Sequence, residues 1–187
     1  MSNNSLTRFA GYAGVAGAII MLTMTFTTKP GATPNLILAL AGDVAGIVLT
    51  AGLYLLYRDY SSGTSLAAGG IAWIGYLLFV VIMFANVSHE PGSPLTTIAD
   101  VSVYILGIGL FSVLALQSGR MPRALAYVGF FAALAGVIVY ILMLGVKLEL
   151  TSPAVIVSYM LYLIGVVVWL GWTGIALLKS STVLATA

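Results

Sequence analysis

Cysteine is absent from the 187 residues, histidine occurs once, and charged side chains make up only 6% of the sequence. Without cysteine the chain can form no disulfide, thiolate metal site, iron–sulfur cluster or cysteine nucleophile. The single histidine, His89, excludes a haem held by two imidazoles. Seven basic and five acidic residues give a net charge of +2 and form no basic patch, so the sequence does not indicate nucleic-acid binding.

Apolar residues are abundant instead, at 61% of the chain. A water-soluble domain usually carries about a quarter charged residues, so this composition indicates lipid as the solvent. Apolar runs of about 20 residues recur along the sequence, and each is long enough to cross a hydrocarbon core of ~30 Å. We therefore predict an all-α integral membrane protein, a single six-helix transmembrane bundle over residues 1–187. The expected membrane-spanning segments, or spans, are 9–27, 36–57, 66–87, 96–117, 124–146 and 154–178.

The basic residues predict the orientation of these spans. Six spans place Lys29 and Lys147 on one side of the membrane and the other basic residues on the opposite side, namely Arg8, Arg58, Arg120, Arg123 and Lys179. The side richer in lysine and arginine is normally cytoplasmic, so both termini are expected in the cytoplasm. Arg58, Arg120 and Arg123 would anchor this topology on anionic headgroups. We expect the protein in a prokaryotic plasma (inner) membrane.

The second and fourth spans resemble each other at an offset of 57 residues. Asp43-Val44 matches Asp100-Val101, and Gly52-Leu53-Tyr54 matches Gly109-Leu110-Phe111. Both segments would cross the membrane in the same direction. The pattern therefore predicts a parallel duplication in which spans two and three form one unit and spans four and five form the other.

Asp43 and Asp100 are the carboxylates that fall inside the predicted spans, at similar depth. An acid within a membrane is costly, which makes it a functional hypothesis by default. Two acids at one level could bind a cation, share a proton or hold a basic group of a ligand. The structural alternative is that both lie near helix N-termini, where backbone N–H groups and the helix dipole favour negative charge. Both interpretations stay open, and no metal site or catalytic residue is predicted.

Small residues recur at four-residue spacing in the first two spans. Ala10, Gly14 and Ala18 share one face of the first span, and Gly42 and Gly46 flank Asp43 in the second. Such faces let helix backbones approach closely in lipid. They predict helix packing within the chain or a face for oligomerisation.

An aromatic stripe formed by Tyr159, Tyr162 and Trp169 shares one face of the sixth span. It is compatible with contact to a partner helix or a hydrophobic cofactor, and equally with core or lipid contacts. No cofactor is predicted, and a bound lipid, quinone or pigment stays open.

Two short segments carry a resemblance to a known group of proteins. The segment 43–58 begins with an acid and ends L-Y-L-L-Y-R, and residues 118–125 read S-G-R-M-P-R-A-L. Both resemble a broad family of uncharacterised bacterial membrane proteins with about six helices. The resemblance covers about half of the chain and implies the fold, including a basic, proline-containing turn that leads into the next span. It implies no activity.

Taken together, these features predict a non-enzymatic protein, either a structural or accessory subunit of a membrane assembly or a self-assembling bundle. Its partners would be membrane lipids and other membrane protein subunits or a second copy of itself. The alternative is a small carrier or channel that uses Asp43 and Asp100. An intramembrane enzyme acting on a lipid or isoprenoid is a third hypothesis, for which two acids and one histidine are few reactive groups.

Overall fold

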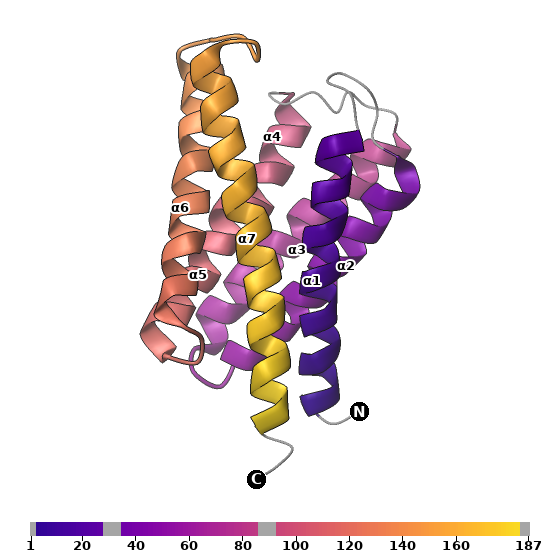
Figure 1. Cartoon of the computed structure of the whole chain (residues 1–187), viewed down its shortest axis with the longest axis vertical. Coiled ribbons are helices and arrows are strands. Elements are labelled where there is room, and N and C mark those ends of the chain that lie inside the picture. The colour runs from indigo at the N-terminus through magenta and orange to yellow at the C-terminus, as the bar shows by residue number, and fades with distance from the viewer. Residues whose placement is uncertain (1–2, 28–34, 86–92, 184–187) are drawn as a thin grey trace.

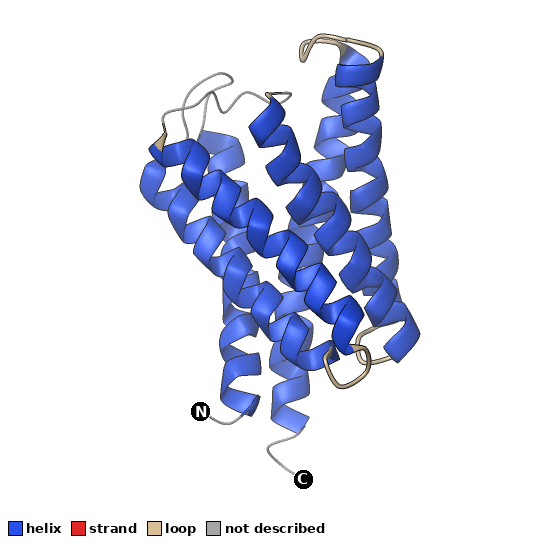
Figure 2. Ribbon diagram, turned by 180° about the vertical axis from the view of Figure 1, so that it is seen from behind, coloured by secondary structure: helices blue, strands red, loops and turns tan. Residues whose placement is uncertain are grey.

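The computed structural model describes residues 3–27, 35–85 and 93–183. Within these ranges all regular structure is helical (Figures 1 and 2). Six spans are long and apolar enough to cross a membrane: Ser5–Thr27, Leu36–Tyr57, Ser62–Phe84, Pro94–Ser118, Arg123–Gly145 and Pro153–Ser180. The prediction of an all-α six-helix bundle is therefore confirmed.

Two of the spans are not continuous α-helices. The fourth span changes from α-helix to π-helix and back, and the fifth ends in a π-helix. The elements in chain order are α1 (Asn3–Thr27), α2 (Leu36–Tyr57), α3 (Ser62–Phe84), α4 (Pro94–Asp100), η1 (Val101–Gly107), α5 (Ile108–Ser118), α6 (Arg123–Tyr140), η2 (Ile141–Gly145) and α7 (Pro153–Val183).

Most helix ends lie within a few residues of the predicted ones, and recognisable capping residues set several of them. The outer ends of the first and last spans were predicted too short, since α1 begins at Asn3 and α7 continues to Val183. The side chain of Asn35 accepts hydrogen bonds from the backbone N–H groups of Ile37, at 3.0 Å, and Leu38, at 3.3 Å, and so caps α2. Pro153 begins α7, as its fixed backbone angle favours. The third span differs from the prediction, since Ser62 already belongs to the first turn of α3. Residues 86 and 87, predicted as its end, lie outside the described residues.

The spans form a ring in the order of the sequence. Each span packs on the next, and α7 packs back on α1, so the first and last helices lie side by side (Figure 1). The start of α1, the end of α7 and the connectors at 58–61 and 119–122 lie at one end of the bundle. This end, which we call the basic end, holds Arg8, Arg58, Arg120, Arg123 and Lys179. Lys147 lies at the opposite end, and Lys29 lies outside the described residues.

The small residues of α1 close this ring. A Cβ atom added at Gly14 would lie 2.9 Å from the Cα atom of Gly174 on α7. Ala10 is 1% exposed and fits against Gly52 of α2, while a Cβ at Gly42 would meet Ile20 at 3.4 Å. The predicted small-residue faces thus serve packing within the chain, where close backbone approach strengthens dispersion contacts.

The arginines at the basic end have different surroundings. The guanidinium of Arg120 donates a hydrogen bond to the carbonyl of Leu56, one of the carbonyls left unpaired in the last turn of α2. Arg58 pairs with Asp59 at 3.5 Å, but both side chains are exposed and such a pair stabilises little. Arg123 is exposed at the start of α6. Their contact with headgroups stays a prediction.

Candidate functional site: an intramembrane aspartate–tyrosine cluster

Asp43 is a buried acid in the middle of apolar surroundings. It lies on α2, is 8% exposed, and its Oδ2 atom has no hydrogen-bond partner among the residues that the structure describes. An unpaired buried polar oxygen costs free energy, and more so in lipid than in water. Structural capping does not explain it, because the first turn of α2 is already capped by Asn35.

Tyr76 of α3 lies beside this acid because Gly46 leaves room for it. A Cβ atom at Gly46 would overlap the Tyr76 ring and hydroxyl, so the phenol lies directly on the α2 backbone. Gly46 follows Asp43 by about one helical turn, and Tyr76 is within electrostatic range of the acid. The glycine therefore determines which side chain faces Asp43.

A polar contact at Thr50, two turns after Asp43 on α2, also holds α3 against α2. The indole N–H of Trp73 donates to the hydroxyl of Thr50 at 2.8 Å, and that hydroxyl donates to the carbonyl of Gly46 at 2.9 Å. Hydrogen bonds between helices in lipid typically contribute about 0.6 kcal/mol. The pair thereby sets the register of α3 that brings Tyr76 to Asp43.

Asp100 is the last residue of α4, directly before the π-helix η1. It accepts a hydrogen bond of 2.5 Å at Oδ2 from the hydroxyl of Tyr140, which is itself the last residue of α6, directly before η2. One short hydrogen bond thus joins the two places where the spans change from α-helix to π-helix. π-Helical segments are rare and frequently mark functional sites.

Tyr104 links the two acids. It lies on η1, within electrostatic range of both Asp43 and Asp100. Its ring meets Tyr162 edge to face at a centroid distance of 6.2 Å, and Tyr162 in turn lies 6.0 Å from the ring of Tyr159. Within the described ranges the two acids therefore share Tyr104 as a neighbour, although no hydrogen bond joins them directly.

We call this group of side chains the aspartate–tyrosine cluster. Its members come from five of the six spans, and they are Asp43, Tyr76, Asp100, Tyr104, Tyr140, Tyr159 and Tyr162. Tyr162 is 3% exposed, and its hydroxyl, like Oδ2 of Asp43, lacks a partner in the described part of the chain. The cluster therefore holds two buried polar atoms that the described residues leave unsatisfied.

Glycine also brings the fourth span close enough to complete the cluster. A Cβ atom at Gly75 of α3 would lie 2.8 Å from the carbonyl oxygen of Ala99, immediately before Asp100. Any larger residue at this position would push α3 and the fourth span apart. Close approach here is what lets Tyr104 reach across to the neighbourhood of Asp43.

In residues 3–27, 35–85 and 93–183, no basic side chain forms an ion pair with Asp43 or Asp100. The ion pair found in these ranges joins Arg58 and Asp59. These ranges also contain no group of three or more histidine, aspartate or glutamate residues that could hold a metal ion. The cluster is thus acidic and aromatic. Chemically, it can accept a proton or a cation from outside the chain.

The sequence-predicted residues divide between the cluster and the surrounding core. Asp43 and Asp100 lie in the cluster with Tyr159 and Tyr162, whereas Trp169 packs further along α7 against Gly129. Sequence reasoning missed Tyr76, Tyr104 and Tyr140. Tyr104 lies four residues after Asp100, so helical spacing was the one available signal for it. Tyr76 and Tyr140 come from other helices and have no such signal.

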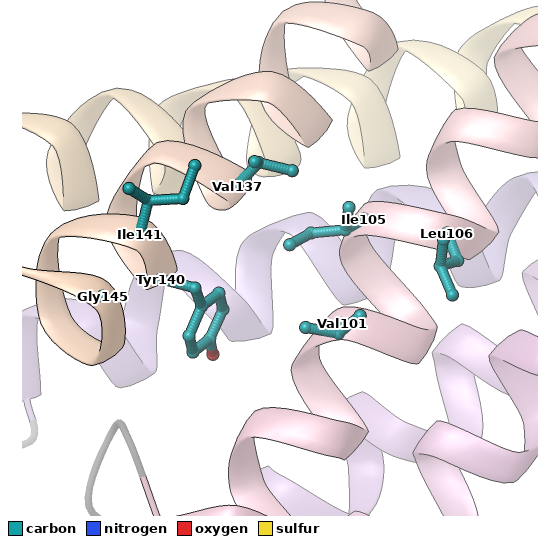
Figure 3. Close-up of a pocket in the computed structure, with 7 residues that line it drawn as sticks. All are labelled: Val101, Ile105, Leu106, Val137, Tyr140, Ile141 and Gly145. Atoms are coloured by element: carbon teal, nitrogen blue, oxygen red, sulfur yellow. The ribbon is translucent and has the colours of Figure 1, made fainter.

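A groove lies on the outer side of the Asp100–Tyr140 hydrogen bond, between the fourth and fifth spans (Figure 3). Its volume is about 490 Å³, and it is lined by Val101, Ile105, Leu106, Val137, Tyr140, Ile141 and Gly145. Tyr140 provides the polar atom among these side chains, and Figure 3 shows its ring between α6 and Val101 of η1. The groove therefore ends, at Tyr140, on the aspartate–tyrosine cluster.

No protein-family model, curated protein or solved structure matches this chain. The resemblance to uncharacterised bacterial membrane proteins stays a prediction, and so does the duplication of helix pairs. The two proposed units differ in helix type, since α2 is α-helical throughout and the fourth span contains η1.

Proposed function

We propose that the protein is a small membrane carrier for cations and that Asp43 and Asp100 are its binding carboxylates. The observation that carries this proposal is Oδ2 of Asp43, which is buried at membrane depth and unpartnered within the described residues. Within the described residues neither helix capping nor an ion pair accounts for an acid at this position. A cation that binds transiently does explain it, since a bound cation would supply the missing partner.

A carrier is favoured over an open channel by the packing between the cluster and the basic end. Large side chains fill this part of the bundle, and each is at most 1% exposed: Leu49, Leu53, Tyr57, Phe111 and Leu114. A cation at the cluster is therefore closed off from the basic end in this conformation. Passage through the bundle would require a second conformation, which is how carriers work.

The alternative of a structural or accessory subunit loses part of its motivation. It was motivated by the small-residue faces, and Ala10, Gly14, Gly42 and Gly46 are all used for contacts within the chain. Nothing in the described residues adds to the enzymatic alternative, because the neighbours of the acids found there are tyrosines, and no group of three or more possible metal ligands occurs in these ranges.

The experiment that tests the carrier is uptake into liposomes that contain the purified full chain. Sodium, potassium and tetraphenylphosphonium would be offered separately under an imposed proton gradient or membrane potential. We expect protein-dependent uptake of at least one of them, lost in Asp43→Asn and in Asp100→Asn. The matched control is Asp59→Asn, an exposed acid in a connector, which should transport normally.

Equal uptake by the wild type and both intramembrane variants would contradict the proposal, as would uptake no faster than in empty liposomes for all three cations. Isolation of the chain from its membrane in a fixed complex with other proteins would then favour the accessory subunit.

A further inference from the structure

The proposed carrier has a groove that opens beside one of its acids, and this groove bears on the kind of cation carried. Its walls come from two spans, with Val101, Ile105 and Leu106 on one side and Val137 and Ile141 on the other. Leu106 and Ile141 are exposed, so the groove faces the lipid. An apolar molecule dissolved in the bilayer can reach it without passing through water.

The groove itself is apolar, and an acid lies behind one of its lining residues. Tyr140 lines the groove and donates its hydroxyl to Asp100, so the carboxylate lies just behind the groove wall. Within the described ranges most basic residues lie at the opposite, basic end of the bundle. Lys147 lies in the connector beyond η2 and is exposed. A positive charge beside Tyr140 would therefore lie close to an acid that no basic side chain of the described residues neutralises.

The acid is surrounded by aromatic rings. Tyr104, Tyr140, Tyr159 and Tyr162 all lie within electrostatic range of Asp100. Tyrosine faces attract cations, most strongly where water is excluded, and they favour weakly hydrated organic cations. Small inorganic cations instead prefer a shell of several oxygen ligands. The described part of the cluster contains two carboxylates and several phenol rings, and this composition suits an organic cation better than a small inorganic one.

We propose that the ion carried is a lipophilic organic cation, which reaches the aspartate–tyrosine cluster from the lipid through the groove between the fourth and fifth spans. The inference rests on the proposed carrier function and specifies its substrate class. Apolar substituents of the cation occupy the groove, its charge lies against Asp100, and the tyrosine rings surround it. The buried hydroxyl of Tyr162 and Oδ2 of Asp43, both unpartnered in the described chain, are further polar groups for the same ligand.

Both walls of the groove contain the places where helix type changes. Val101, Ile105 and Leu106 belong to η1, whereas Ile141 and Gly145 belong to η2. The regular i to i+4 hydrogen bonds of an α-helix are replaced in these segments, which makes them suited to small local rearrangements. If the hydrogen bond from Tyr140 to Asp100 breaks, the groove would then widen next to Tyr140, where the cation enters the cluster.

The test is binding of tetraphenylphosphonium to the purified full chain in detergent, measured by equilibrium dialysis. Triphenylphosphine oxide, which is neutral and also carries aromatic rings, serves as the matched ligand. We expect saturable binding of the cation, weakened at least about tenfold by Asp100→Asn, because the substitution removes a full charge at nearly constant shape. Binding of the neutral ligand should not respond to that substitution.

Two valine substitutions show whether a change in cation binding comes from the groove or from a general effect on the bundle. Val137→Phe fills the groove, whereas Val81→Phe makes the same change at an exposed position of α3 outside it. We expect Val137→Phe to weaken cation binding several-fold and Val81→Phe to leave it unchanged. Because both positions face lipid, both variants should fold, and elution as a single species checks this.

The outcomes distinguish the inference from the proposed function. Unaltered cation binding in Asp100→Asn, or equal effects of the two phenylalanine variants, would overturn the inference. Aspartate-dependent uptake of sodium or potassium without tetraphenylphosphonium binding would overturn it too, while leaving the carrier intact. Groove-dependent binding of tetraphenylphosphonium without uptake of any cation would support the site and contradict the carrier.

Discussion

Asp43 and Gly46 lie one turn apart on α2, and the missing side chain of Gly46 leaves room for Tyr76 beside Asp43. The Tyr76 ring rests on the backbone at Gly46, so the space that a methyl group would need is already filled. Because Gly46 has no side chain, the phenol of Tyr76 can lie beside the intramembrane acid Asp43. At this scale the site depends on close contact as much as on charge.

Gly46→Ala tests that dependence. The added Cβ would overlap Tyr76, and we expect a loss of about 1–3 kcal/mol in the free energy of unfolding, as overpacking of a core usually costs. Thermal unfolding in detergent would measure it. The matched control is Gly70→Ala on α3, where no described atom beyond the adjoining residues and backbone of the same helix lies within 4 Å of the added Cβ. That change should be neutral or stabilise by up to about 1 kcal/mol, because alanine is the better helix former. Equal effects at the two positions would show that Tyr76 does not rest on Gly46.

At the scale of elements, the Asp100–Tyr140 hydrogen bond joins the fourth and fifth spans where each becomes π-helical. The hydroxyl donates to a carboxylate, so the bond is expected to be stronger than one between neutral groups. It also holds the inner wall of the groove in place. Its strength can be measured separately from the packing of the two helices.

A double-mutant cycle with Asp100→Asn and Tyr140→Phe isolates this interaction. We expect a coupling free energy of about 1–2 kcal/mol in the unfolding equilibrium, near the upper limit seen for hydrogen bonds between membrane helices. The pair Tyr127→Phe and Asp100→Asn should be additive, because Tyr127 is exposed at the other end of α6. Additivity in the Asp100–Tyr140 pair as well would mean that the hydrogen bond contributes nothing.

The spans were predictable from sequence because lipid obliges each backbone to satisfy its hydrogen bonds within its own helix. Length and apolarity are then enough, and proline, serine and asparagine mark the ends. The π-helices η1 and η2 left no comparable signal, since their sequences V-S-V-Y-I-L-G and I-L-M-L-G are apolar like the rest.

The candidate site was predictable only in part for a related reason. Asp43 and Asp100 are noticeable in any apolar sequence, because a charge in lipid is costly. Tyr76 and Tyr140 become their neighbours through lateral packing between helices, and for Tyr76 this packing depends on the contact at Gly46. Tyrosine at the end of a span is common at the membrane surface, so sequence alone suggests that explanation first.

At the scale of the whole molecule, the six spans place two sets of connectors on opposite sides of the membrane. The connector at Asp59 belongs to the basic end, and the one at Thr151 belongs to the opposite end. The distribution of lysine and arginine predicts that the basic end is cytoplasmic.

The absence of cysteine makes this orientation easy to test. Asp59→Cys and Thr151→Cys each introduce a single thiol at an exposed position. In intact cells a membrane-impermeant maleimide should label Thr151→Cys, and it should label Asp59→Cys only after the cells are opened. Labelling in the reverse order would invert the topology, and labelling of both in intact cells would contradict the odd number of crossings between them.

The contact between α1 and α7 has a consequence for how the protein is made. During synthesis α1 can pack against α2 as soon as both are in the membrane. The surface around Gly11 and Gly14 stays without its partner until Gly174 on α7 has been made. Contacts so distant in sequence form late and slow the folding process. Assembly should therefore be cooperative: until α7 has left the ribosome, the ring stays open on one side and the small-residue surface of α1 is in contact with lipid.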